Sequence, residues 1–162
     1  MGAAITWLIM SQRSTSNVRP VAATQPSAIA AATPDVSGMS AGEEAVTLGN
    51  FAYDHQHWPE AIRRYEEAIA SGVDSADVHT DLGNAFRFSS QPEQALTQYQ
   101  LAQKLNPQHE NSLFNQITLL GEVLNEPVRA AQISEDFIRR FPNSDKLPAV
   151  REQLARMKGT PP

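Results

Sequence analysis

The histidines are the side chains of this 162-residue chain whose chemistry is easiest to recognise. There are four of them: His55, His57, His79 and His109. His55 and His57 lie in an expected turn between helices, next to Asp54 and Glu60, and imidazoles with carboxylates are metal-ligand types. Two histidines and loose acids in a turn lack the fixed geometry of three or four ligands. A metal-binding or enzymatic role for the His55/His57 turn is therefore the less favoured alternative, and polar turn chemistry is the favoured one.

Other catalytic chemistries have no motif to support them. The chain has no cysteine, which excludes disulfides, thiol catalysis and thiolate metal sites. It has no glycine-rich phosphate loop, no Ser/His/Asp order and no HExxH pattern. The formal net charge is −5, and no Lys/Arg cluster with interleaved aromatic residues occurs. We therefore expect no enzyme activity, no cofactor, no metal and no nucleic-acid partner.

A group of residue types returns after 34 positions, which is the mark of a repeat protein. Leu48, Gly49, Asn50, Ala61, Tyr65 and Ala68 recur as Leu82, Gly83, Asn84, Ala95, Tyr99 and Ala102. Small residues belong where two helices approach closely, and a tyrosine fills the gap toward the next repeat. Each repeat should be a helical pair that buries its apolar face only by stacking on its neighbours.

These residues resemble the tetratricopeptide repeat family, in which Leu-Gly, Ala, an aromatic residue, Ala and a final Pro follow in this order. The resemblance covers about two-thirds of the chain. It implies an all-α fold, a right-handed α-solenoid of antiparallel helix pairs with about seven helices. The expected units are repeats over about 42–74, 75–108 and 109–143, and a capping helix over 144–158 with Ser144 as its N-cap. The third repeat is degenerate: Ser134 replaces the aromatic residue, and one inserted residue is expected in the turn near Asn125-Glu126-Pro127.

The chain before the repeats has a different composition. The domain is expected over 40–159, opened by a capping box of Ser40 and Glu43. Residues 14–39 are mostly Ala, Ser, Thr, Pro and Gly and are predicted to be a disordered linker. Residues 1–13 form a short apolar segment that would extend only about 13 Å as a helix, too short to span a bilayer. It is interpreted either as the remnant of a membrane anchor or as a short apolar tail. Membrane association in a bacterium, on an undetermined side, is the first expectation, and a soluble cytoplasmic protein is the alternative.

The tetratricopeptide resemblance also implies a binding surface, the concave groove formed by the first helix of each pair. Its predicted residues are Asn50, Tyr53, Asp54, Asp77, Asp81, Asn84, Arg87, Phe88, Asn111, Phe114, Asn115 and Thr118. Asn50 and Asn84 are the most informative, because a repeated amide offers a donor and an acceptor to a peptide backbone. The alternative is that each asparagine bonds only within its own helices. His79 stands where the family often has Trp and is expected to be partly buried packing.

The groove is expected to prefer a neutral or basic segment of a partner protein, because its acids outnumber its single Arg87. A clamp for a terminal carboxylate, known from co-chaperones of this family, is disfavoured, because its basic positions carry Val46, Asn111 and Asn115. The resulting hypothesis is a protein-interaction module, an adaptor or assembly factor that holds an extended segment or a helix. Self-association is the alternative, with exposed apolar residues such as Phe141 docking a second copy.

Overall fold

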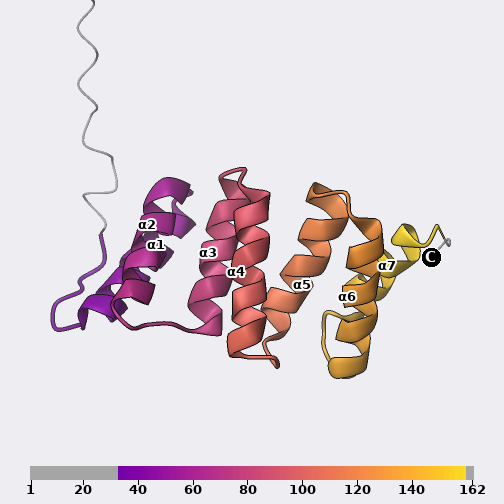
Figure 1. Ribbon diagram of the computed structural model, residues 1–162. Helices are drawn as coiled ribbons and strands as arrows, with labels where there is room; N and C mark the ends of the chain where they lie inside the picture. Colours follow the sequence, from indigo (N-terminus) through magenta and orange to yellow (C-terminus); the bar gives the residue numbers. More distant parts are fainter. Residues whose placement is uncertain (1–32, 160–162) are drawn as a thin grey trace, which may run out of the picture. The chain divides into compact units, whose positions relative to one another are not determined.

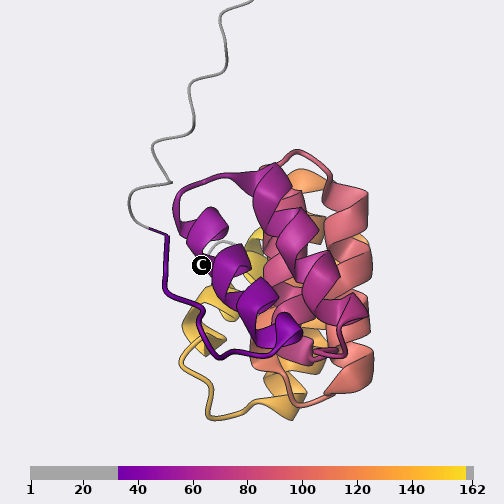
Figure 2. The ribbon, with the colours of Figure 1, turned by 90° about the vertical axis from the view of Figure 1, so that its left-hand side faces the viewer.

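The computed structural model describes residues 33–159, which form a unit of their own. Residues 1–32, with the apolar segment and most of the predicted linker, lie outside the described part. Within 33–159 the fold is all-α, and its helices follow one another in antiparallel pairs (Figure 1). The helices are α1 Ala41–Asp54, α2 Trp58–Ala70, α3 Ala76–Phe88, α4 Pro92–Leu105, α5 Glu110–Thr118, α6 Pro127–Arg140 and α7 Leu147–Met157. A π-helical segment, Leu119–Val123, extends α5. Viewed from the α1/α2 end, the later pairs lie behind the first (Figure 2).

The repeated glycines lie at the contact between the two helices of a pair, as predicted. The side chains that they meet are the repeated tyrosines, which were predicted to fill the gap toward the next repeat. A Cβ atom at Gly49 would lie 2.8 Å from Cε1 of Tyr65, and one at Gly83 would lie 2.5 Å from Cε1 of Tyr99. Real Cβ atoms do not approach this closely, so only glycine lets the tyrosine ring pack this near to the first helix. Both rings are buried. The residues that recur after 34 positions are therefore those that pack the two helices of each pair together.

The turns inside the three pairs share one backbone conformation. Gln56, Ser90 and Asn125 have positive φ values of 60°, 62° and 53°. Each is followed by the N-cap of the second helix, and Pro92 and Pro127 then occupy the first helical position, where a missing N–H costs nothing. The same turn is thus built from three different residue types.

The inserted residue of the third repeat lies in the helix and not in the turn, so the predicted position was wrong. The N–H groups of His57 and Gln91 donate to carbonyls five residues back, whereas the N–H of Glu126 donates to Leu120, six residues back. The π-helical segment Leu119–Val123 contains the extra residue. A one-residue insertion commonly survives as a π-bulge, because the widened turn leaves the flanking helix in register. The Asn125 turn keeps the geometry of the other two.

The core divides into two clusters of buried side chains. The first contains the repeated alanines and tyrosines of α1 to α4, and the second joins α5, α6 and α7. Phe141 belongs to the second cluster: it is 7% exposed and its ring centroid lies 5.0 Å from that of Phe137. Phe141 is therefore not the exposed apolar residue that self-association was expected to use.

Both ends of the helical unit were predicted from capping signals, with different outcomes. The capping box at Ser40 is confirmed, because its side chain accepts from the Glu43 N–H and the Glu43 carboxylate accepts from the Ser40 N–H. The last helix begins at Leu147, so Ser144 is not its N-cap. Ser144 instead donates its hydroxyl to Glu110 at 2.7 Å and accepts from the Lys146 N–H. Its hydroxyl thus joins the segment between α6 and α7 to Glu110 at the start of α5.

None of the helices described here is both long and apolar enough to cross a membrane.

Candidate functional site

The candidate site lies on α1, α3 and α5, the first helices of the three pairs. We call the twelve residues predicted above the A-helix face. Five of them are exposed: Asn50, Asp54, Asp77, Phe88 and Asn111. The other seven are partly buried: Tyr53, Asp81, Asn84, Arg87, Phe114, Asn115 and Thr118. The face is therefore polar and acidic, with one basic residue.

Asn50 and Asn84 occupy equivalent positions and make equivalent bonds. The Tyr65 hydroxyl donates to Oδ1 of Asn50, and the Tyr99 hydroxyl donates to Oδ1 of Asn84, both at 2.8 Å. Burial raises the pKa of both tyrosines, so the hydroxyls stay protonated donors. Each side-chain oxygen is thereby used inside the repeat, while neither Nδ2 has a bonding partner among residues 33–159. In each amide, Oδ1 therefore makes the hydrogen bond within the repeat, and Nδ2 is left as a donor that a ligand could use.

The A-helix face is linked from one repeat to the next. Asn115 donates its Nδ2 to Oδ1 of Asn84 at 2.9 Å, which joins α5 to α3. Phe114 packs against the second core cluster, and Thr118 accepts from Nε2 of Gln153 in α7. The structure therefore brings Asn84 and Asn115 together but turns Phe114 and Thr118 toward the C-terminal helices.

Asp81 is a partly buried carboxylate with no hydrogen bond or ion pair within the described residues. Burial is the largest cause that raises its pKa, to about 6, and the nearby charge of Asp77 raises it further, whereas His109 lowers it. A raised pKa means that the surroundings of the carboxyl group disfavour its charged form. A donor or a cation from outside the repeat would relieve that penalty.

We expect Asp81→Asn to stabilise the protein at pH 7 by about 1–2 kcal/mol. The rise of the pKa from 3.8 to about 6 corresponds to at most about 3 kcal/mol, and partial exposure reduces this. Because the folded state holds the proton more tightly, stability should fall as pH rises from about 4 to about 6. The gain should therefore vanish near pH 4. Urea unfolding at both pH values measures it, with exposed Asp54→Asn as the control. A loss of stability at pH 7 would mean that the Asp81 carboxylate makes a favourable contact.

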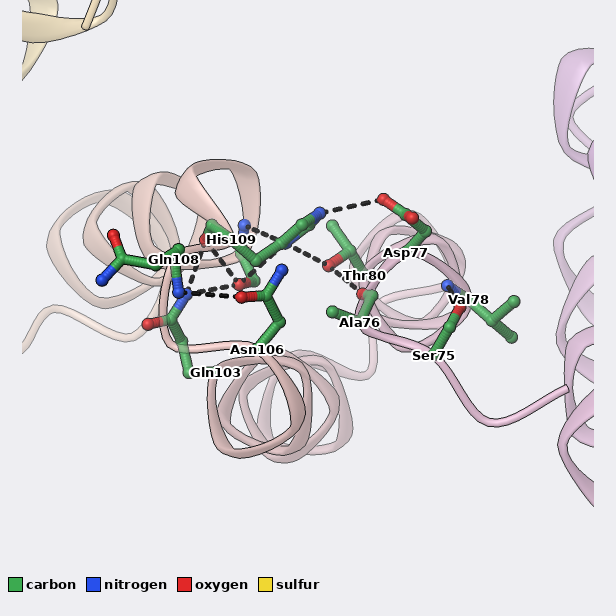
Figure 3. A network of polar contacts seen from close by, with 10 residues as sticks. Ser75, Ala76, Asp77, Val78, Thr80, Gln103, Asn106, Gln108 and His109 are labelled. Carbon is green, nitrogen blue, oxygen red and sulfur yellow. Dashed lines mark hydrogen bonds and ion pairs between the residues drawn. The ribbon is translucent and has the colours of Figure 1, made fainter. Parts of the chain in front are cut away.

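His109 joins the second and third repeats, and its ring reaches Asp77 of α3 (Figure 3). Its Nδ1 accepts from the Ser112 N–H at 3.3 Å, which caps α5, so Nε2 carries the proton and donates to Asp77 at 3.0 Å. Gln103 of α4 donates to the backbone oxygen of His109. The residue is a structural connector, which its sequence context did not reveal.

The remaining histidines have local partners. His79 is buried, as predicted, and its ring nitrogens lie 2.6 Å from Oε1 of Gln98 and 2.8 Å from Oδ1 of Asp74. His55 donates Nδ1 to the carbonyl of Phe51, and His57 is an N-cap without a side-chain bond. No group of three metal-ligating residues comes together in the part of the chain that the structure describes.

The structure places one further residue, which was not predicted from the sequence, beside the A-helix face. Trp58, the first residue of α2, lies 5.2 Å from Tyr53 and 5.0 Å from Phe88 between ring centroids. The signal was present in the sequence: an aromatic residue stands directly after the turn where the other two pairs have proline.

Stacked antiparallel helix pairs define an α-solenoid, and in this one the first helices of the pairs carry a polar face. Among such solenoids the fold is that of the tetratricopeptide repeat, as solved structures at low sequence identity show. The TPR2B domain of yeast Sti1, in a complex with pHsp70, superposes with a TM-score of 0.67 at 16% identity over 73% of this chain and 96% of that chain. The TPR domain of Arabidopsis OM64 gives 0.64 at 20% identity over 72% and 95%. The second TPR domain of human RPAP3, bound to the HSP70 peptide SGPTIEEVD, gives 0.61 at 18% identity over 73% and 92%. No protein-family model and no curated protein sequence matches the chain.

Proposed function

We propose that this protein is an interaction module, an adaptor or assembly factor that holds an extended segment or a helix of a partner protein along the A-helix face. The observation that carries the proposal is the pair Asn50 and Asn84. Tyr65 and Tyr99 hold the two amides through Oδ1 and leave each Nδ2 as a donor. Donors spaced by one repeat suit the carbonyl groups of an extended backbone.

The charge of the face supports a neutral or basic segment. Two of the similar structures contain Hsp70 ligands, and the peptide of one, SGPTIEEVD, is acidic. On the present chain Asp54, Asp77 and Asp81 stand against Arg87. Like charges placed together across an interface are unfavourable, so an acidic segment should be rejected. A membrane tether through residues 1–13 remains part of the proposal and rests on their apolar composition alone.

Photo-cross-linking locates the bound partner. In the full chain, p-benzoylphenylalanine replaces exposed Asn111 on α5 or, as the matched control, exposed Leu101 on α4. We expect a defined adduct in cells from position 111 and none from position 101. The cross-linked segment, identified by mass spectrometry, is then synthesised and labelled for binding measurements.

The double variant Asn50→Asp, Asn84→Asp tests the amide donors themselves. Aspartate keeps an oxygen that accepts from each tyrosine but removes both N–H donors, so the repeats should fold. We expect the labelled segment to bind at least about tenfold more weakly, at roughly 1 kcal/mol for each lost hydrogen bond. An unchanged Kd, or equal adducts from both cross-linker positions, would contradict binding along the A-helix face.

A further inference from the structure

Three aromatic rings meet at the boundary between the first and second repeats. Tyr53 is the last residue but one of α1, Trp58 begins α2 and Phe88 ends α3. The ring centroids lie 5.2 Å apart for Tyr53 and Trp58, 5.0 Å for Trp58 and Phe88, and 6.1 Å for Tyr53 and Phe88. Phe88 is 50% exposed. We call these three residues the aromatic patch.

The fold itself does not require these rings, because the next repeat builds the same place without them. In the next repeat Arg87 and Pro92 stand 34 residues after Tyr53 and Trp58. The position of Phe88 falls in the π-helical segment, on Glu122 when counted along the helix and on Val123 when counted back from the turn, and neither residue is aromatic. The turns beside both sets have a positive φ at equivalent positions, Gln56 and Ser90, and the N-cap of the second helix follows directly in each. Phe88 is half-exposed, and the fold can be built without Trp58. Exposed apolar residues that the fold does not need indicate a binding surface.

Two carboxylates without a protein partner lie beside the aromatic patch. Neither the Asp54 carboxylate nor the Asp81 carboxylate has a hydrogen bond or an ion pair within residues 33–159. Both lie close enough to Tyr53 that their charges help to raise the pKa of its hydroxyl, after the larger effect of burial. The guanidinium carbon of Arg87 lies 5.6 Å from the centroid of Phe88, so one ring of the aromatic patch already contacts a guanidinium. Near the aromatic patch, the positive charge of Arg87 is thus outnumbered by the carboxylates of Asp54 and Asp81.

We propose that the aromatic patch, with Asp54 and Asp81, binds the side chain of an arginine or lysine in the partner's segment. Aromatic faces attract a cation, and they also pack against its aliphatic stem. The carboxylates select this occupant over a purely apolar one, because an apolar residue would desolvate them without supplying a charge or a donor. The inference rests on the proposed function, since it concerns a residue of the segment held on the A-helix face.

A pair of isosteric peptides tests the charge directly. The probes are acetyl-Gly-Ser-Arg-Ser-Gly-amide and the same peptide with citrulline, which keeps the shape of arginine without its charge. The full chain carries Trp7→Phe, which leaves Trp58 as the only tryptophan. We expect the arginine peptide to shift the Trp58 indole NMR signal saturably and the citrulline peptide to bind at least about tenfold more weakly.

Variants locate the site and supply the control. Phe88→Gln replaces a half-exposed ring at the end of α3 by a neutral polar side chain, so folding should be preserved. This variant and the double variant Asp54→Asn, Asp81→Asn should each weaken the arginine peptide about fivefold or more. Val128→Gln, which changes an exposed apolar residue of α6, should leave its binding unchanged.

The outcomes separate this inference from the proposed function. Equal binding of the citrulline peptide would overturn a cation site in favour of apolar docking, and unchanged binding to Phe88→Gln would remove the aromatic patch. If the arginine peptide fails to bind while the cross-linked partner still depends on Asn50 and Asn84, this inference falls and the proposed function stands. If the partner does not depend on the two asparagines, the proposed function fails instead.

Discussion

Replacing Tyr99 with alanine is expected to lower the free energy of unfolding by about 3–5 kcal/mol, the range for removing a large buried aromatic side chain. The ring has no exposed surface and fills the space over Gly83. Its hydroxyl also holds Asn84. Because the stability of a domain is of the order of 5–15 kcal/mol, the variant should unfold at a much lower urea concentration. Far-UV circular dichroism during urea titration measures the change.

Two matched variants show which part of Tyr99 matters. Tyr99→Phe keeps the ring and removes only the bond to Asn84, so a cost of about 1 kcal/mol is expected. Leu101→Ala changes an exposed residue of the same helix and should alter stability by no more than about 0.5 kcal/mol. A Tyr99→Ala cost as small as that of Leu101→Ala would show that the ring does not support the helix pair.

Gly83→Ala is expected to cost about 2–3 kcal/mol, although alanine is the better helix former by about 1 kcal/mol. The added Cβ would lie 2.5 Å and 2.7 Å from two ring carbons of Tyr99 and 3.2 Å from the backbone oxygen of Ala95. A rigid ring and a backbone atom cannot move away as a flexible side-chain end can. Gly49→Ala, whose Cβ would lie 2.8 Å from the Tyr65 ring, should cost less. Urea unfolding of both variants gives the comparison.

A double-mutant cycle assigns this cost to the contact. Tyr99→Leu removes the ring atoms that the new Cβ would meet, so the pair Gly83→Ala, Tyr99→Leu should be less destabilised than the sum of the single variants, by more than about 1 kcal/mol. Strictly additive effects would place the cause of the Gly83→Ala cost elsewhere.

The helix pairs and their main contacts could be predicted because they are local and periodic. Gly83 and Ala95 were matched from the sequence as small residues of one pair, and the structure brings them together. The position of the Tyr99 ring on Gly83 was not predicted. The Ser40 capping box is read over four residues, and the hydrogen bonds are those that its residue types predict. Where the period fails, the prediction fails too: the third repeat's inserted residue was placed in the turn, and the start of α7 three residues early.

The sequence by itself determined the solenoid of helix pairs, the small residues at which the helices touch and the acidic balance of their first-helix face. Only the tertiary structure decided how individual side chains are used there. Asn84 meets Asn115 from 31 residues away, Trp58 meets Phe88 across a repeat boundary, and Phe141 turns into the core. The physical reason is that a period specifies the backbone and its nearest contacts. Which side chains meet between repeats depends on how neighbouring helices cross, and a one-residue π-bulge is enough to change it.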